Sequence, residues 1–145
     1  MDSFDKLAAD MRKLNKRIPE FASEKASDLS QRIAAGLIGS TPVDTSKALS
    51  NWQIGVNEEP DEEVEAYVPG SKGSSQAESA QIAYLKAKKE LERKKPREPI
   101  YIVNNVEYID DLNAGKSPQA PAGFVEFQVE FQVRSFEGQK WELEL

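Results

Sequence analysis

Residues 41–56 read TPVDTSKALSNWQIGV, and this stretch takes the chain from helix to sheet. The first six residues predict a turn, because Pro42 restricts the backbone and polar side chains follow it. Asp44 or Thr45 can then cap a short helix through Leu49 by accepting a hydrogen bond from a free amide of the first turn. The last five residues alternate apolar with polar or small side chains, which is typical of a half-buried strand. The apolar ones are Trp52, Ile54 and Val56.

A long amphipathic helix is expected before this stretch. Apolar residues recur at steps of three and four from residue 4 to residue 37, which is helical spacing and also matches a heptad-like seam. The pattern predicts a helix lying on a sheet, with a self-associating coil as the alternative. Pro19 is expected to kink this helix or to begin a second one, because it has no amide hydrogen and clashes with the preceding turn. The helix is expected to end near Gly36 or Gly39.

The segment after the strand is acidic and then flexible. Residues 58–65 are mostly carboxylates, and residues 69–75 are rich in glycine and serine. A calcium loop needs oxygen ligands at alternating positions and a glycine at its turn, so the acidic run is interpreted as a solvated turn instead. Residues 64–68 are expected to form a second strand that pairs with residues 52–56 as an antiparallel hairpin.

Residues 76–95 predict a helix whose last turns are strongly basic. Positive charge at the carboxyl end of a helix is favoured by the helix dipole, which is a structural explanation. The alternative is a functional basic patch that contacts the acidic residues 58–65 of a neighbouring copy, or passing DNA. The candidate contact residues are Lys86, Lys88, Lys89, Arg93, Lys94, Lys95 and Arg97.

The last third of the chain contains a strand, a short helix and one ambiguous segment. Residues 100–103 are β-branched or aromatic and predict a buried strand, and residues 106–112 predict a short helix that stops at Gly115. Residues 125–133 alternate like a strand. As a helix they leave two apolar stripes, and such a helix would have to be sandwiched between the sheet and a neighbour. The end of the chain alternates again, which indicates an edge strand or a docking tail, at Trp141, Leu143 and Leu145.

The composition limits the functions that the chain can perform. Its 145 residues suit a single domain, divided into a helical segment (1–40), an α+β core (41–135) and a tail (136–145). It has neither cysteine nor histidine, which excludes thiol chemistry and removes the commonest general base and transition-metal ligand. We therefore expect no enzymatic activity and no cofactor. The best carboxylate pairs for an enzyme are Asp110 with Asp111 and Asp61 with Glu63, but adjacent carboxylates on a helix point in different directions.

Charge and hydropathy bear on partners and location. The net charge is -6, which argues against a protein that coats nucleic acid, because phosphate neutralisation needs an excess of Lys and Arg. No apolar run approaches the roughly 20 residues needed to cross a bilayer, and the first residues lack the basic and apolar regions of a signal peptide. We expect the protein to be made and used in a cytoplasm-like compartment, away from membranes.

Two separated blocks of the chain stand out from the periodic patterns. The first is TPVDT (41–45) with Leu49 and NWQ (51–53); the second is YIVNN (101–105) with Tyr108, LN (112–113), Gly115, Ser117 and QAPAGFVE (119–126). Together they resemble the tail-completion and neck proteins of tailed bacteriophages, the group that includes the lambda minor tail protein Z type. The likeness runs in the same order from residue 1 to residue 135. One departure is Ser46, where the family usually has glycine.

The resemblance implies an α+β fold in which a small antiparallel sheet is packed by the long N-terminal helix and further helices, as in tail terminators. It implies a structural virion protein that forms a ring, usually a hexamer, at the head–tail junction, joins the connector to the tail and surrounds the DNA channel. The alternative is a tail terminator that caps the tail tube before head joining. The resemblance also favours a helix over residues 121–135.

Partners and a location follow from the same resemblance. The expected partners are other copies of the chain, a portal, adaptor or head-completion protein, a tail tube or tail hub protein, and the passing genomic DNA without sequence preference. The expected location is the virion, and the host cytoplasm during assembly. The motif positions are expected either to determine the fold or to form ring contacts: Thr41, Pro42, Val43, Asp44, Thr45, Trp52, Asn104, Asn105, Tyr108, Leu112, Gly115, Gln119, Ala120, Pro121 and Gly123.

Overall fold

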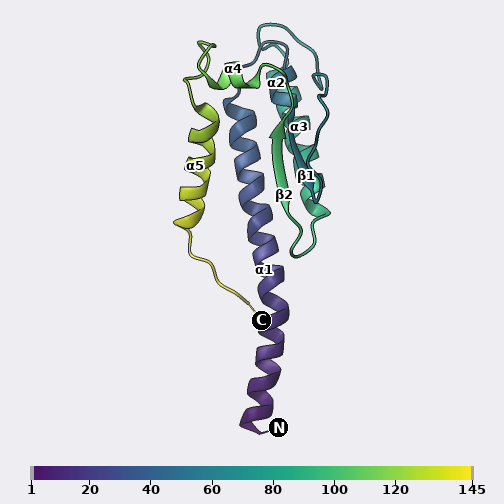
Figure 1. Ribbon diagram of the computed structural model, residues 1–145, viewed down its shortest axis with the longest axis vertical. Helices are drawn as coiled ribbons and strands as arrows, with labels where there is room; N and C mark the ends of the chain where they lie inside the picture. Colours follow the sequence, from purple (N-terminus) through teal and green to yellow (C-terminus); the bar gives the residue numbers. More distant parts are fainter. Residues whose placement is uncertain (1, 145) are drawn as a thin grey trace.

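A single 38-residue helix, α1 (Ser3–Ser40), forms the long axis of the molecule, and the other elements pack around its C-terminal half (Figure 1). The computed structural model describes residues 2–144 and has the α+β fold class that the sequence predicts. The Asp2 side chain caps the first turn by accepting a hydrogen bond from the Asp5 amide at 2.9 Å. The helix ends where Thr41 becomes extended.

Pro19 lies inside α1 without ending it, so the prediction that a second helix would begin there was wrong. Figure 1 shows α1 as one continuous helix. Proline removes the hydrogen bond to the carbonyl of Asn15, but Asn15 is exposed, so water can replace that bond. The N-terminal part of α1 projects beyond the rest of the chain, and we call residues 3–18 the stalk. Among residues 2–144, no helix combines the length and apolar character needed to span a membrane.

The sheet over residues 2–144 consists of β1 (Trp52–Val56) and β2 (Ile100–Asn104), which pair antiparallel. Trp52 lies opposite Asn104, and Val56 lies opposite Ile100. Both strands were predicted, but not their pairing. The expected hairpin partner of β1, residues 64–68, is not a strand.

Polar side chains occupy the backbone groups that a strand at residues 64–68 would need for pairing. The Asn51 side chain donates to the Val64 carbonyl and accepts from the Val64 amide, both at 2.8 Å. Ser79 Oγ accepts from the Val68 amide at 2.9 Å and donates to the Val68 carbonyl at 3.0 Å. The hairpin prediction was wrong because these side chains hold the segment as a loop.

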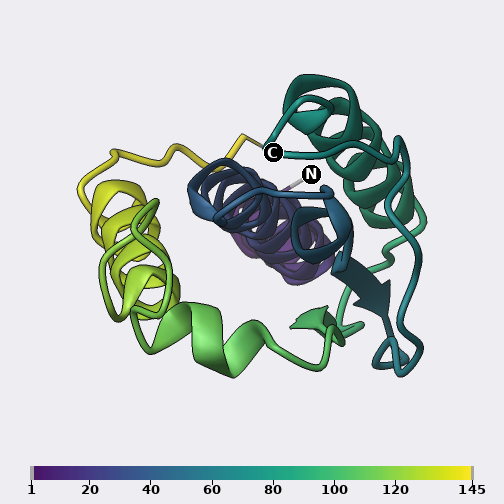
Figure 2. The same cartoon turned by 90° about the horizontal axis from the view of Figure 1, so that it is seen from above.

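One side of α1 is covered by the sheet and by α3 (Gln76–Glu92), with the short α2 (Lys47–Ser50) near the end of α1 (Figure 2). The predicted helix over residues 76–95 is confirmed but ends three residues earlier, before Pro96 and Pro99. The core lies in this contact. Its buried apolar residues are Ala34, Leu37, Ile38, Val43, Leu49, Trp52, Ile54, Ala83, Ala87 and Leu91.

The other side of α1 is covered by α5 (Phe124–Glu137), which follows the short α4 (Ile109–Asn113) (Figures 1 and 2). The helical interpretation of this segment is confirmed, although α5 packs against α1 and not against the sheet. The two helices approach closely at Gly36, where an added Cβ would lie 2.6 Å from Oε1 of Gln128 and 3.2 Å from Nε2 of Gln132. Gly36 therefore allows two glutamines of α5 to lie against α1.

After α5 the chain returns to α1 (Figure 1). Residues 138–144 contain no strand, so the predicted edge strand is absent from the described part of the tail, and Leu145 lies outside the described residues. The tail lies on the α5 side of α1, away from both strands (Figure 2). Trp141 packs on Phe136 with ring centroids 4.7 Å apart, and Arg17 Nε donates to the Glu144 carbonyl at 3.0 Å. The tail thus reaches the base of the stalk.

Candidate functional site

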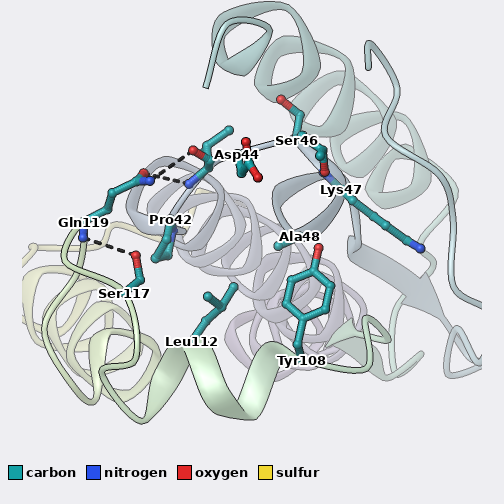
Figure 3. Close-up of a pocket in the computed structure, with 11 residues that line it drawn as sticks. Pro42, Asp44, Ser46, Lys47, Ala48, Tyr108, Leu112, Ser117 and Gln119 are labelled. Atoms are coloured by element: carbon teal, nitrogen blue, oxygen red, sulfur yellow. Dashed lines mark hydrogen bonds between the residues drawn. The ribbon is translucent and has the colours of Figure 1, made fainter. Parts of the chain in front are cut away.

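The two motif blocks meet in one place. Residues 42–48 face α4 and the loop after it across a pocket of about 220 Å³, which we call the motif pocket (Figure 3). It is lined by Pro42, Val43, Asp44, Thr45, Ser46, Lys47, Ala48, Tyr108, Leu112, Ser117 and Gln119. Most of the positions that line the pocket therefore belong to the blocks identified in the sequence.

Gln119 holds the two blocks together. Its side chain accepts a hydrogen bond from the Val43 amide at 2.8 Å and donates one to the Val43 carbonyl at 3.1 Å (Figure 3). The Gln119 amide donates to Ser117 Oγ at 3.2 Å. The glutamine thereby satisfies both backbone groups of a turn residue that lies outside the sheet. Gln119 is a structural clamp, and its side chain is already committed within the chain.

The turn at the edge of the pocket leads into α2, whose N-cap is Ser46 and carries no side-chain capping hydrogen bond. Thr45 lies one residue before the cap; its Oγ1 accepts from the Lys47 amide at 3.3 Å, but Thr45 is not the cap that one predicted alternative required. The other alternative was also wrong, because Asp44 accepts from the Lys72 amide at 2.7 Å and fastens the glycine-rich loop. Ser46 is buried with φ +74°, so a serine adopts here the left-handed conformation that the glycine usual in the resembled family takes without strain.

Trp52 and Thr41 anchor the first block to α1. Trp52 Nε1 donates to Thr41 Oγ1 at 2.7 Å, and that hydroxyl donates to the Leu37 carbonyl at 2.6 Å. Trp52 and Thr41 are both buried. These two motif residues determine the fold and are not a contact surface of the single chain.

Asn104 and Asn105 act at the end of β2, as predicted. Asn104 donates to the Ala48 carbonyl at 2.8 Å and accepts from the Val106 amide at 3.1 Å. Asn105 donates to the Pro60 carbonyl at 2.9 Å. Both asparagines fix loops to the sheet, so their role is structural.

The second block is shaped by Asn113 and two glycines. Gly115 with φ +88° follows α4, as predicted, and Gly123 with φ +78° precedes α5. The Asn113 carbonyl accepts from the Gly123 amide at 2.7 Å, and its Oδ1 accepts from the Val125 amide at 3.0 Å. Its Nδ2 donates to both carboxylate oxygens of Glu126 at 2.9 and 3.0 Å, which lowers the pKa of Glu126. In the loop between the glycines, Ala120 is buried and Pro121 is exposed.

Two ionisable side chains border the motif pocket. Lys47 Nζ lies 2.5 Å from Glu63 Oε1, and this hydrogen bond raises the pKa of Lys47. Burial raises the pKa of Tyr108, which remains 40% exposed. Both shifts keep the groups in their ordinary protonation states at neutral pH, with lysine charged and tyrosine neutral. Neither shift activates Lys47 or Tyr108 as a nucleophile.

The predicted basic patch is dispersed among partners on its own chain. Lys86 Nζ lies 5.2 Å from the Tyr67 ring centroid, Arg93 pairs with Glu90 at 2.8 Å, and Lys94 donates to Ser23 at 2.7 Å. The other four candidates, Lys88, Lys89, Lys95 and Arg97, are exposed.

Two carboxylates of the acidic segment 58–65 lie near a lysine of their own chain. Glu63 and Glu65 lie 2.5 and 3.8 Å from Lys47 Nζ. Val64, an apolar residue of the segment, lines one groove together with Lys86, Lys89 and Arg93.

The carboxylates considered for catalysis are not gathered into a centre. Asp110 and Asp111 are exposed on α4, and Asp111 pairs with Lys116 at 3.0 Å. Asp61 is exposed in the loop near Glu63, whose partner is Lys47. Within residues 2–144, no three acidic side chains lie close enough to hold a metal ion.

Phe127 and Phe131 form an apolar surface that the sequence analysis did not assign to a site. They are 63% and 53% exposed, and their rings stack with centroids 6.1 Å apart. The residues that follow them in sequence, Gln128 and Gln132, face Gly36 of α1. The signal was present in the sequence, because two apolar stripes on one helix imply a partner on each side.

A second apolar surface runs along the stalk. The stalk projects beyond the body (Figure 1), and its apolar side chains, which keep the heptad-like spacing of the sequence, are exposed. Phe4, Leu7, Met11, Leu14 and Ile18 are 83%, 55%, 56%, 37% and 49% exposed. Further along the seam Phe21, Ala26, Leu29 and Ile33 are half-buried and Leu37 is buried, so the stalk is the least covered part of the seam.

Comparisons of this chain with protein-family models, with curated proteins and with solved structures found no match. Function is therefore argued from the two motif blocks, the motif pocket they form and the two exposed apolar surfaces.

Proposed function

We propose that this chain is a structural virion protein that forms a ring at the head–tail junction of a tailed bacteriophage, joins the connector to the tail and surrounds the DNA channel. It works in the virion, after assembly in the host cytoplasm, and performs no covalent chemistry. The alternative position is that of a tail terminator, which caps the tail tube before head joining. The motif blocks that resemble tail-completion and neck proteins support both positions.

The observation that carries the proposal is the exposed phenylalanine pair of α5. The helix buries Phe124 and Phe136 but leaves the stacked pair Phe127 and Phe131 in solvent. Burial of a phenylalanine side chain is worth about 1.5–3 kcal/mol, so a monomer leaves much of this stabilisation unused. An exposed pair of large apolar side chains of this kind is typical of an interaction surface.

A ring requires two different surfaces on each subunit. Heterologous contacts, in which one surface fits a different surface of the next copy, close into a ring when the rotation between copies allows it. The Phe127–Phe131 pair and the stalk are two such surfaces on one chain. The motif pocket lies at the far end of α1 from the stalk (Figures 1 and 3), and in this proposal it meets the portal, adaptor or tail protein.

The mass of the purified protein in solution tests the proposal. Light scattering over a range of concentrations should find a discrete multimer for the natural chain and a monomer for Phe127→Lys/Phe131→Lys. Ala77→Lys/Gln81→Lys is the matched control, because it adds the same charge at exposed positions with the same spacing on α3. The control should associate like the natural chain.

Two results would contradict the proposal. One is a natural chain that stays monomeric at every concentration, and the other is a phenylalanine variant that associates like the natural chain. A hexamer present at all concentrations would favour the terminator position. Association only at the highest concentrations would favour the neck position, in which the connector organises the ring.

A further inference from the structure

We infer that the stalk of one copy lies antiparallel along the outer face of α5 in the next copy, and that its apolar stripe covers Phe127 and Phe131. This inference rests on the proposed function and names the two surfaces that make the ring contact. Each α5 is then held between its own α1 and the stalk of a neighbour.

The stalk that covers α5 must come from another copy. Because α1 is one continuous helix, its N-terminal part cannot fold back onto its own α5. Gly36 marks the point where α1 touches α5, and Met11 is the centre of the stalk stripe. At 1.5 Å per residue these two points lie roughly 38 Å apart along the helix axis.

The two surfaces match in length and in character. The 14 residues of α5 span about 21 Å, and the stalk from residue 3 to residue 18 spans about 24 Å. Each exposes large apolar side chains along one face: Phe127 and Phe131 on α5, and the Phe4–Ile18 series on the stalk. Two helices that pack side chains of this kind lie about 8–10 Å apart, which removes both stripes from water.

The net charges of the two surfaces are opposite. Residues 2–18 carry five cationic and three anionic side chains, whereas α5 carries three anionic side chains and one cationic. The whole chain is acidic, with a net charge of -6, so the stalk is a positive exception. Attraction between surfaces of opposite charge favours packing of the stalk on α5 over packing of one stalk on another stalk.

The order of charges along each helix selects the antiparallel orientation. Lys13 and Lys16 lie in the second half of the stalk, and Glu126 and Glu130 lie in the first half of α5. An antiparallel pair places these lysines beside these glutamates, and it places Asp10 near Arg134. A parallel pair would place the acidic start of the stalk beside the acidic start of α5, which costs energy.

The stalk and α5 lie at different places on the same chain, so the contact between copies is heterologous. A copy that offers its stalk to one neighbour offers its α5 to another, so the contact repeats around an assembly. The subunits follow one another end to end along the ring, with each stalk reaching onto the body of the next copy. If the rotation did not close, the same contact would give an open filament.

Engineered disulfides test the inference directly, because the natural chain has no cysteine. Leu14→Cys and Phe131→Cys are made as separate full-length variants, mixed and oxidised. The antiparallel register that places Ile18 opposite Phe127 also places Leu14 opposite Phe131, because each pair of apolar residues is four positions apart, so the mixture should give a crosslinked dimer. Leu7 lies about two helical turns from the position opposite Phe131, so Leu7→Cys mixed with Phe131→Cys should not crosslink. The exposed control Ala77→Cys mixed with Phe131→Cys should not crosslink either.

The double variant Leu14→Cys/Phe131→Cys should give a ladder of crosslinked species that ends at the closed ring. Crosslinking of Leu14→Cys with itself, or of Phe131→Cys with itself, would overturn the inference in favour of a two-fold contact. Crosslinking of Leu7→Cys in place of Leu14→Cys would overturn this register. If light scattering finds the multimer but no mixture crosslinks, the ring contact is elsewhere and the proposed function stands without this inference.

Discussion

At the scale of single residues, Thr41 joins the end of α1 to the start of β1 through one hydroxyl. It accepts from the Trp52 indole and donates to the Leu37 carbonyl, and Trp52 is only 7% exposed. Thr41→Val keeps the shape of the side chain but leaves the buried indole N–H without a partner. We expect the free energy of unfolding to fall by about 1–3 kcal/mol, measured by urea denaturation.

A double-mutant cycle with Trp52→Phe separates this hydrogen bond from packing. Phenylalanine lacks the N–H, so Thr41→Val should cost less in the Trp52→Phe background than in the natural chain. An equal cost in both backgrounds would show that the indole–hydroxyl hydrogen bond does not stabilise the fold.

Ser46 is the second residue whose conformation can be measured. It holds φ +74° and shares a hydrogen bond with Ser75 across 2.8 Å. Ser46→Ala and Ser46→Gly both lose that bond, but only glycine relieves the left-handed strain, which costs about 1–2 kcal/mol for other residues. Ser46→Gly should therefore be more stable than Ser46→Ala in thermal unfolding. An alanine variant at least as stable as the glycine variant would contradict the strain.

Some residue roles could be predicted, but distant partners could not. Thr45 and Asp44 were equal candidates to cap the short helix, and the Lys72 amide, 28 residues away, donates to the Asp44 carboxylate. Asn104 and Asn105 were correctly expected to bond backbone at the strand end, but their partners Ala48 and Pro60 lie 56 and 45 residues away. The clamp of Gln119 on Val43 spans 76 residues and had no local signal.

At the scale of elements, the strand-like period of residues 125–133 was misleading. The alternation of Phe and Val with Glu and Gln is satisfied in a helix because Gly36 makes room for Gln128 and Gln132. The helix was expected from the family resemblance and not from the period. The hairpin prediction failed for a different reason. Residues 64–68 have the sequence pattern of a strand, but the side chains of Asn51 and Ser79 already form the hydrogen bonds of their backbone groups.

The start of α5 predicts a pH dependence. Hydrogen bonds from Asn113 lower the pKa of Glu126 below its ordinary value of 4.5. Because the folded pKa lies below the unfolded one, the ionised carboxylate stabilises the fold at neutral pH, and this contribution is lost as the pH falls below 4.5 and through the folded pKa.

Glu126→Gln measures that contribution. The variant should be less stable than the natural chain at about pH 7, and the difference should shrink as the pH falls below 4.5 and Glu126 is protonated, first in the unfolded and then in the folded state. Urea midpoints measured along an acid pH series give the comparison. A difference of the same size throughout the series would mean that the charge of Glu126 is not what stabilises the start of α5.

At the scale of the whole molecule, the fold class was predictable but the stalk was not. Apolar residues recur at helical spacing in both halves of α1, and the helix end predicted at Pro19 is absent, so the pattern does not show which half stays uncovered. The boundary of the covered part follows from relative lengths, because α3 with 17 residues and α5 with 14 cover only part of a 38-residue helix. The exposed apolar residues of the stalk are the feature of the fold from which we infer an assembly of copies.

The central claim is that copies of this chain close into a ring. Electron microscopy of the purified full-length protein, at a concentration where light scattering finds the multimer, tests it most directly. We predict class averages of a closed ring with an open centre, absent from Phe127→Lys/Phe131→Lys. Solid particles without a central opening, or unclosed filaments in place of rings, would contradict the claim.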